Sequence, residues 1–223
     1  MSISLLLDNA EPAKWRRWFG SGIFHGITTN PTLIKKAGQQ CSLSNLKYLT
    51  QEAQDIGYRE IHIQTWGKSI EEIVSCGFSI GNLSTSETKI YVKIPITKTG
   101  VEAANILIKS GISITFTACY EAKQVLIAAS VGASYIAPYL GRINDEGRNG
   151  TKEILEMKNI LKGTASKCKI LVASIRDYRE INYLASNGLS TFTINSKIAE
   201  DLFCSNSTMK ANEIFEKDSK ILS

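Results

Sequence analysis

Regular alternation between short strand-like runs and helical segments is the feature that most limits how this chain can fold. Eight runs of β-branched and apolar residues are each followed by a stretch with helical periodicity. The pattern is typical of parallel βαβ units, because a parallel neighbour is reached through a crossover helix. The expected strands lie at 3–7, 22–28, 59–64, 89–94, 112–117, 134–139, 169–174 and 190–194.

Helical segments follow these strands, and their ends carry typical signals. We expect helices at 12–19, 43–54, 69–76, 101–110, 121–130, 152–161, 177–187, 196–203 and 208–217. Ser42 or Ser44 is suited to cap the second of these helices, and a glycine follows several of them, as is usual where a helix ends. The polar stretch 141–150 predicts a loop before the helix that follows the sixth strand.

Eight strand and helix units in 223 residues, without a linker or a change in composition, predict a single domain over residues 1–223. The predicted fold is a (β/α)8 TIM barrel of the α/β class with an extra C-terminal helix at 208–217. An open, doubly wound sheet is the alternative. It is less favoured because no Gly-x-Gly-x-x-Gly motif follows the first strand.

The composition excludes other classes of protein. Hydrophobic residues make up 43% of the chain and charged residues 21%, which is usual for a globular protein and does not indicate disorder. The net charge of +5 includes no long basic run, so we expect no nucleic-acid partner. On charge alone, a solvated surface explains the basic excess better than a phosphorylated substrate does.

The cysteines and the start of the chain indicate a cytoplasmic location. Five cysteines are scattered without metal-ligand spacing, which fits reduced thiols in a cytosol. The first residues lack the features of a secretion signal, and no apolar run approaches the length of a membrane span. We therefore expect neither secretion nor a membrane segment.

Polar residues stand at the ends of the expected strands. In a barrel these ends and the loops after them form the functional face, whereas a structural closure would use small or apolar side chains. Because alternate residues of a strand share a face, His62 lies on the face of Gln64 and Thr115 on that of Thr117. The strand-end residues are Asp8, Asn30, Gln64, Lys93, Thr117, Tyr139, Ser174 and Asn195.

Lys93 lies near the end of the strand at 89–94. It shares a face with Tyr91, while Val92 and Ile94 point to the other face. A lysine enclosed by uncharged polar groups is suited to attack a ketone and form a Schiff base. Taken alone, this stretch favours a different reading, in which Lys93 extends to solvent from a sheet edge.

Asp8 is the carboxylate that could accept or donate a proton beside this amine. Its alternative role is to cap the first helix. Other polar strand ends could hydrogen-bond a water for hydrolysis of the Schiff base, or could be ordinary buried polar residues: Gln64, Thr117 and Tyr139. A second set follows strands six and seven, where barrels commonly bind phosphate: Arg142, Ser174 and Arg176. Surface ion pairing is the alternative for either arginine.

Some titratable residues are weaker candidates. His25 and His62 have no partner at the spacing of a metal site or a catalytic triad, so we expect buried, hydrogen-bonded histidines. Lys35 and Lys36 are expected to face solvent.

Five ordered motifs together resemble the small transaldolase and fructose-6-phosphate aldolase family over nearly the whole chain. They are Leu-Asp at 7–8, Gly-Ile-Thr-Thr-Asn-Pro-Thr at 26–32, Val-Lys-Ile-Pro-Ile-Thr at 92–97, Ala-Pro-Tyr-Leu-Gly-Arg-Ile at 137–143 and Ala-Ser-Ile-Arg at 173–176. The resemblance implies a class I Schiff-base mechanism that needs no metal and no cofactor, acting on sugar phosphates.

The resemblance also assigns roles to individual residues. Lys93 falls on the catalytic lysine, Asp8 on the acid/base aspartate and Thr117 on the threonine that positions water. Asn30 falls on the asparagine that holds the dihydroxyacetone moiety, and Thr28 is a further predicted substrate-binding residue. The implied phosphate-binding positions are Arg142, Ser174 and Arg176. Small members of the family form homo-oligomers, including ring-stacked decamers whose C-terminal helix reaches a neighbour, as the helix at 208–217 could.

Gln64 and Tyr139 favour one of the two activities of this family. The resemblance places both on the aldolase pattern, whereas transaldolases typically carry glutamate and phenylalanine there. Arg176 instead fits the transaldolase pattern, and the stretch 61–67 matches neither group closely. We therefore predict cleavage or formation of fructose 6-phosphate from dihydroxyacetone and glyceraldehyde 3-phosphate. The alternatives are a transaldolase of the pentose phosphate pathway and a catalytically silent barrel that binds sugar phosphates.

Overall fold

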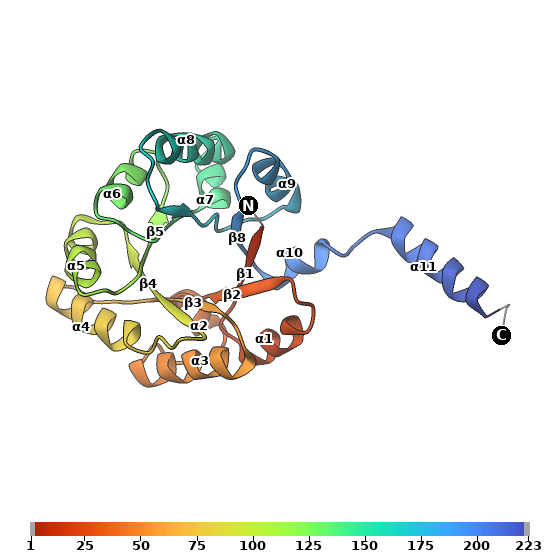
Figure 1. Ribbon diagram of the computed structural model, residues 1–223, viewed down its shortest axis with the longest axis horizontal. Coiled ribbons are helices and arrows are strands. Elements are labelled where there is room, and N and C mark those ends of the chain that lie inside the picture. Colours follow the sequence, from red (N-terminus) through yellow and green to blue (C-terminus); the bar gives the residue numbers. More distant parts are fainter. Residues whose placement is uncertain (1–2, 221–223) are drawn as a thin grey trace.

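The eight expected strands are present and parallel in a computed structural model that describes residues 3–220 (Figure 1). Their bounds are β1 Ser4–Asp8, β2 Phe24–Thr28, β3 Glu60–Gln64, β4 Lys89–Pro95, β5 Ile114–Cys119, β6 Tyr135–Pro138, β7 Lys169–Ile170 and β8 Thr191–Ile194. The sheet runs from β7 through β6, β5, β4, β3, β2 and β1 to β8. A parallel bridge between Val172 and Phe192 joins its two ends, so the strands form a barrel.

Helices surround this barrel. Those that were expected are α1 Pro12–Phe19, α3 Leu43–Ile56, α4 Ile70–Gly81, α5 Lys98–Lys109, α6 Gln124–Ser130, α8 Gly150–Gly163, α9 Tyr178–Ser186, α10 Ser196–Asp201 and α11 Asn206–Ser219. Of the two serines expected to cap α3, Ser42 does so, because its hydroxyl accepts a hydrogen bond from the backbone nitrogen of Asn45. The TIM barrel with an extra C-terminal helix is therefore confirmed.

Two short helices were not expected, α2 Pro31–Lys36 and α7 Leu140–Asp145. The second replaces the first part of the predicted loop at 141–150, so that prediction was wrong there. Six residues give too few turns for a recognisable periodicity. The start of α2 does carry a local signal, since Asn30 caps it and Pro31 occupies its first position.

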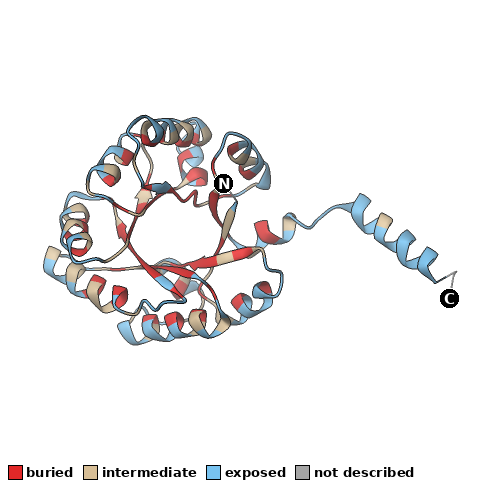
Figure 2. Cartoon of the chain, viewed as in Figure 1, coloured by how far each residue is buried: buried red, intermediate tan, exposed pale blue. Residues whose placement is uncertain are grey.

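The β4 strand separates two layers of the core, as its alternation predicted. Val92 and Ile94 are fully buried between the sheet and the helices. Tyr91 points the opposite way, into the barrel, where it packs with other inward-facing residues. Buried residues accordingly follow the strands and the inner sides of the helices (Figure 2).

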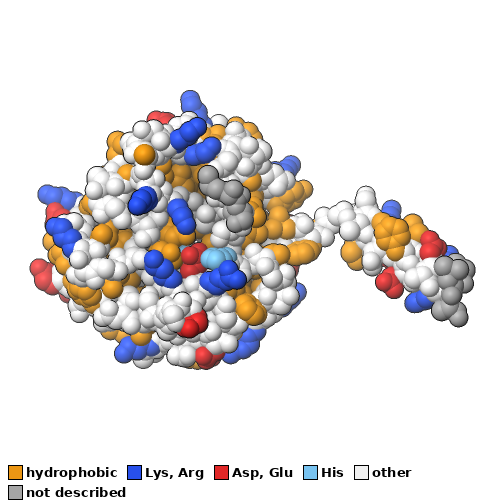
Figure 3. All heavy atoms as spheres, in the orientation of Figure 1, with side chains coloured by type: hydrophobic (Ala, Val, Ile, Leu, Met, Phe, Trp, Pro, Cys, Tyr) orange, Lys and Arg blue, Asp and Glu red, His pale blue; other side chains and the backbone are white. Residues whose placement is uncertain are grey.

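The lower half of the barrel, where the strands begin, is filled by aromatic and polar side chains. The ring of His62 stacks on Tyr91 at 4.6 Å and meets Tyr135 edge-on at 5.0 Å. Lys89 and Lys169 lie over the two tyrosine rings, at 5.2 and 5.6 Å. This end of the barrel faces the viewer in Figure 3, with Lys and Arg side chains around its centre.

The α11 helix projects away from the barrel (Figure 1), and none of its residues is buried. Met209, Ile214 and Phe215 are 58%, 56% and 68% exposed. Within residues 3–220, no helix is long and apolar enough to cross a membrane.

Candidate active site

A cavity of about 130 Å³ opens where the strands end. Of the ten predicted site residues, seven line it: Asp8, Thr28, Asn30, Lys93, Tyr139, Arg142 and Ser174. They come from five different strands or the segments that follow them, so only the closed barrel brings them together. The functional face predicted from the polar strand ends therefore contains a real cavity.

Lys93 is 5% exposed and lines the cavity from the middle of the sheet. Its strand lies between β3 and β5, where Lys93 pairs with Gln64 and Thr115. The alternative of a lysine extending to solvent from a sheet edge was therefore wrong. Its Nζ donates a hydrogen bond to the backbone oxygen of Thr29 at 2.9 Å. This contact orients the amine and leaves its remaining positions toward the cavity.

Two threonines hold the carboxylate of Asp8. The hydroxyl of Thr28 donates to Oδ1 of Asp8 at 2.6 Å, and Oγ1 of Thr193 lies 2.6 Å from that of Thr28. Since Thr28 has one proton to give, Thr193 is the donor in the second contact. Asp8 does not cap α1, whose N-cap residue is Glu11. The second carboxylate oxygen is thus available to the cavity.

Asn30 serves two purposes at the end of β2. Its Oδ1 accepts a hydrogen bond from the backbone nitrogen of Leu33 at 3.0 Å and so caps α2. The side chain also lines the cavity. Its amide nitrogen takes no part in the cap and is a donor for a ligand hydroxyl.

Tyr139 contacts both a polar strand-end residue, Thr117, and the cationic side chain of Arg142. Its hydroxyl lies 2.8 Å from Oγ1 of Thr117, and the guanidinium of Arg142 lies 4.7 Å from the centre of its ring. The other side of Arg142 donates to the hydroxyl of Tyr120 at 3.3 Å. This hydrogen bond is the main reason that the pKa of Arg142 lies above its ordinary value.

The backbone of Ser174 adopts a left-handed conformation, with φ of 58°. The start of α7 packs against it, since the nitrogen of Gly141 donates to the oxygen of Ser174 at 2.9 Å. Any side chain at position 141 would collide with that oxygen. Glycine therefore allows α7 to bring Arg142 beside Ser174.

Four predicted residues fall outside this lining: Gln64, Thr117, Arg176 and Asn195. Thr117 lies behind Tyr139, to which it is hydrogen-bonded. Gln64 borders a second cavity beside β4, next to Trp66 and Pro95. Arg176 is exposed and makes a two-point ion pair with Asp145, which is the alternative expected for either arginine. Asn195 instead caps α10 by accepting from the nitrogen of Ile198 at 3.0 Å.

Of the seven lining residues that were not predicted as site residues, Lys36 and Thr193 carry polar groups that bear on the chemistry. Lys36 was expected to face solvent; it is exposed but lines the cavity from the end of α2. Thr193 was missed because Asn195 was taken as the end of the last strand. The alternation of Thr191, Phe192 and Thr193 could have indicated its inward face.

One histidine matches its prediction and the other only in part. His62 is fully buried, with Nδ1 2.8 Å from Oγ1 of Thr115. Burial lowers its pKa, and the nearby carboxylate of Glu60 offsets only part of this effect. Burial also raises the pKa of Glu60, but His62 and other cations lower it further, so the net change is downward. His25 is half-buried.

Solved structures of low sequence identity share the barrel. Dihydrodipicolinate synthase from Rhodopseudomonas palustris superimposes with a TM-score of 0.60 at 6% identity, covering 86% of this chain and 69% of that one. A mutant flavocytochrome b2 gives the same score at 13% identity, covering 87% of this chain and 57% of that one. At these identities the likeness shows the fold alone.

Relatives of higher sequence identity are named probable transaldolases. A probable transaldolase of Dictyoglomus turgidum is 32% identical over 97% of both chains. A probable transaldolase of Methanococcus vannielii is 29% identical over 90% of both chains. The family model for transaldolase/fructose-6-phosphate aldolase matches residues 5–222. The chain therefore belongs to the transaldolase/fructose-6-phosphate aldolase family.

Proposed function

We propose that this protein is a Schiff-base transaldolase that moves a dihydroxyacetone unit between sugar phosphates through Lys93. The observation that carries the proposal is a buried amine in one cavity with a carboxylate, Asp8, and a phenol, Tyr139. The names of the relatives support transfer of the unit over its release. The preference for the aldolase reading, which rested on Gln64 and Tyr139, is therefore reversed.

The first steps use Lys93 and Asp8. The neutral amine of Lys93 attacks the C2 carbonyl of a ketose phosphate, and loss of water gives a protonated imine. Asp8 then accepts the proton of the C4 hydroxyl as the C3–C4 bond breaks. The electron pair of that bond moves into the imine, giving an enamine on Lys93, and the aldehyde phosphate leaves.

Transfer reverses this cleavage with a second aldehyde. The enamine carbon attacks the carbonyl carbon of the acceptor, whose oxygen takes up the proton held by Asp8. Water then adds to the imine, and its hydrolysis releases the new ketose and the free amine. Tyr139 and Thr117, which share a hydrogen bond, are placed to guide that water.

Arg142 and Ser174 are the proposed phosphate ligands. Both line the cavity on the side opposite β2, and Gly141 fixes their relative position. A guanidinium suits phosphate because its donors can bind two oxygens together. Arg176 would have to exchange its ion pair with Asp145 for the phosphate to play the same role.

Fructose-6-phosphate aldolase activity is the second candidate. Its support is Tyr139, which lines the cavity and whose phenol could protonate the enamine when no acceptor is bound. Protonation at carbon, followed by hydrolysis, would release free dihydroxyacetone.

Dependence on an acceptor separates the two activities. Glyceraldehyde 3-phosphate release from fructose 6-phosphate should be measured with and without erythrose 4-phosphate. Strict dependence on the acceptor supports the transaldolase and removes the aldolase. Comparable release without acceptor would overturn the transaldolase proposal in favour of the second candidate.

Trapping the intermediate tests the chemistry shared by both. Borohydride reduction in the presence of fructose 6-phosphate should add a mass to the peptide that contains Lys93. Absence of this adduct, together with absence of turnover, would leave the silent sugar-phosphate binder. Lys98, an exposed lysine at the start of α5, serves as the internal control because it should stay unmodified.

We further propose that α11 packs on a neighbouring subunit of a homo-oligomer. Three apolar side chains of this helix are each more than half exposed: Met209, Ile214 and Phe215. A helix that exposes apolar side chains gains stability when a neighbour covers them. Mass measurement in solution tests the assembly, and a monomer at micromolar concentration would contradict it.

A further inference from the structure

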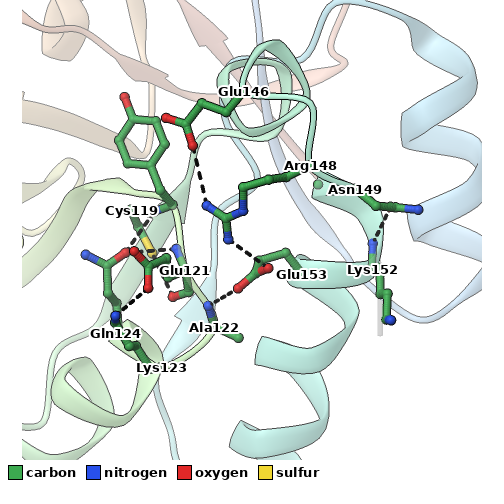
Figure 4. Close-up of polar contacts among 12 residues, drawn as sticks. Cys119, Glu121, Ala122, Lys123, Gln124, Glu146, Arg148, Asn149, Lys152 and Glu153 are labelled. Atoms are coloured by element: carbon green, nitrogen blue, oxygen red, sulfur yellow. Dashed lines mark hydrogen bonds and ion pairs between the residues drawn. The ribbon is translucent and has the colours of Figure 1, made fainter.

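The backbone segment that follows β5 is fixed by a side chain of the next helix. Oε1 of Gln124 accepts hydrogen bonds from the backbone nitrogens of Tyr120 and Glu121, at 2.8 and 3.0 Å (Figure 4). A single acceptor therefore satisfies two successive donors and holds the turn in one conformation.

A carboxylate from a more distant helix anchors the same segment. Glu153 of α8 accepts a hydrogen bond from the backbone nitrogen of Ala122 (Figure 4). Its other oxygen pairs with Arg148 at 2.9 Å. The position of Tyr120 is thus tied to both α6 and α8.

The residue two positions before Tyr120 has an unusual backbone. Ala118 adopts φ of 54°, and the register between β5 and β6 shifts between Phe116 and Cys119. A left-handed alanine costs on the order of 1 kcal/mol, so it persists only where the surroundings enforce it. The shift turns the chain so that Tyr120 extends over the next strand end.

Tyr120 contacts two residues of the site at once. Its ring meets the ring of Tyr139 edge-on, with centroids 5.7 Å apart and an interplanar angle of 68°. Its hydroxyl accepts from Nη1 of Arg142 at 3.3 Å. Arg142 in turn lies over the face of Tyr139. The three side chains thus form a closed set of contacts.

The lining of the cavity includes Tyr139 and Arg142 but not Tyr120. Tyr120 is half-buried behind them. We propose that Tyr120 is a positioning residue whose hydroxyl holds Arg142 for the substrate phosphate and whose ring holds the phenol of Tyr139. This inference rests on the proposed function, because it assigns the phosphate to Arg142.

The two contacts of Tyr120 can be removed separately. Tyr120→Phe deletes the hydroxyl and frees Arg142 while keeping the ring against Tyr139. Tyr120→Leu deletes both contacts. The first variant should therefore weaken phosphate recognition alone, and the second should also slow the chemical step.

Kinetics with fructose 6-phosphate and with fructose as donors test this separation. Tyr120→Phe should raise KM for fructose 6-phosphate about three- to tenfold, the effect of one lost hydrogen bond to a charged group. It should leave kcat/KM for fructose within about twofold. Tyr120→Leu should in addition lower kcat for both donors, because Tyr139 loses its orientation.

Tyr183→Phe is the matched control, since Tyr183 is 51% exposed on α9, away from the cavity. It should leave both donors unchanged, and circular dichroism should show that all variants are folded. Equal losses with both donors in Tyr120→Phe would indicate a general structural role and overturn the inference. An unchanged KM for fructose 6-phosphate would also overturn it.

Binding of inorganic phosphate tests the inference without turnover. Calorimetric titration should show tighter binding to wild type than to Tyr120→Phe, by about three- to tenfold. If wild type forms no borohydride adduct yet this difference is found, the proposed function fails and the role of Tyr120 stands. If phosphate binds both proteins equally, or neither, the role of Tyr120 fails whatever the outcome with borohydride.

Discussion

The upper and lower halves of the barrel interior are built from the same strands but differ in what their side chains contact. Lys93 and Thr117 lie one layer above Tyr91 and Thr115 on the same inward faces. Lys93 lines an open cavity, and Thr117 contacts Tyr139, which lines the same cavity. The lower residues contact one another around His62.

Under the proposed function, this difference would separate chemistry from stability within one sheet. Inward-facing side chains two residues apart on one strand are separated by about 7 Å. That distance is enough for one to lie at the cavity and the other in the packed interior. A polar group in the upper layer keeps donors or acceptors for a substrate. In the lower layer the partners are protein groups, as with His62 and Thr115.

Lys93→Met should give the largest difference between the loss of activity and the loss of stability. Turnover should fall by at least about a thousandfold, because the nucleophile is lost. The free energy of unfolding should change by no more than about 1 kcal/mol, since a buried amine and its one hydrogen bond are replaced by an apolar chain of similar size. Activity assays and urea denaturation measure the two effects. A loss of stability of several kcal/mol would show that Lys93 also stabilises the fold and would contradict the prediction. Lys98→Met is the control, because it makes the same change at an exposed lysine.

His62→Ala in the lower layer should instead reduce stability and leave most of the activity. This change removes two ring contacts and a hydrogen bond, so it should lower the free energy of unfolding by about 3 kcal/mol. Turnover of the folded fraction should stay within about tenfold of wild type, since the change is one layer from the cavity. His25→Ala provides the comparison at a half-buried site. A collapse of turnover without loss of stability would place His62 in the catalytic layer.

The pH dependence of stability should also come from the lower layer. The pKa of His62 is lower in the folded protein than its ordinary value of 6.5, so the unfolded chain binds more protons below that pH. Stability is therefore full above pH 6.5 and declines as the pH falls toward the folded pKa. Glu60, whose pKa also lies below its ordinary 4.5, adds a further loss below that value.

Urea denaturation of wild type and His62→Phe at pH 7 and 5 measures the part due to this histidine. The decline between the two pH values should be smaller in the variant, which keeps an aromatic ring but cannot be protonated. An equal decline in both proteins would assign the effect to other groups, and His25→Phe is the matched control.

The smallest expected effect is at the rim of the upper layer. Lys36 lines the cavity, yet it makes no ion pair within residues 3–220. Lys36→Gln should raise KM for phosphorylated substrates about two- to fivefold through loss of a nearby positive charge, and high salt should shrink this difference. Lys35→Gln, one residue earlier on α2, is the control. Equal effects of both changes would mean that only net charge matters.

The inward faces were predictable because they depend on local periodicity. Lys93, Tyr91 and Val92 occupy the faces that alternation assigns, and Asp8, Thr28 and Tyr139 reach the cavity because parallel strands end on one side of a barrel. The family was predictable from motifs in fixed order.

Other features depend on contacts that local patterns do not encode. The ion pair of Arg176 joins residues 31 positions apart, and nothing near either residue indicates it. Strand β7 is two residues long rather than six because the chain after Ile170 leaves regular pairing and turns sharply at Ser174. Lys36 faces solvent as expected, but its place beside the cavity was missed because the helix that carries it was too short to recognise.

The packing of Gly141 against Ser174 has a consequence for how this sequence can diverge. The contact is between backbones, so most side chains around it can be exchanged without breaking it. Position 141 itself can hold no side chain while α7 stays where it is. Over long periods we expect sequence drift to alter the neighbours of this position and to leave the glycine, because its loss would separate Arg142 from Ser174 in a single step.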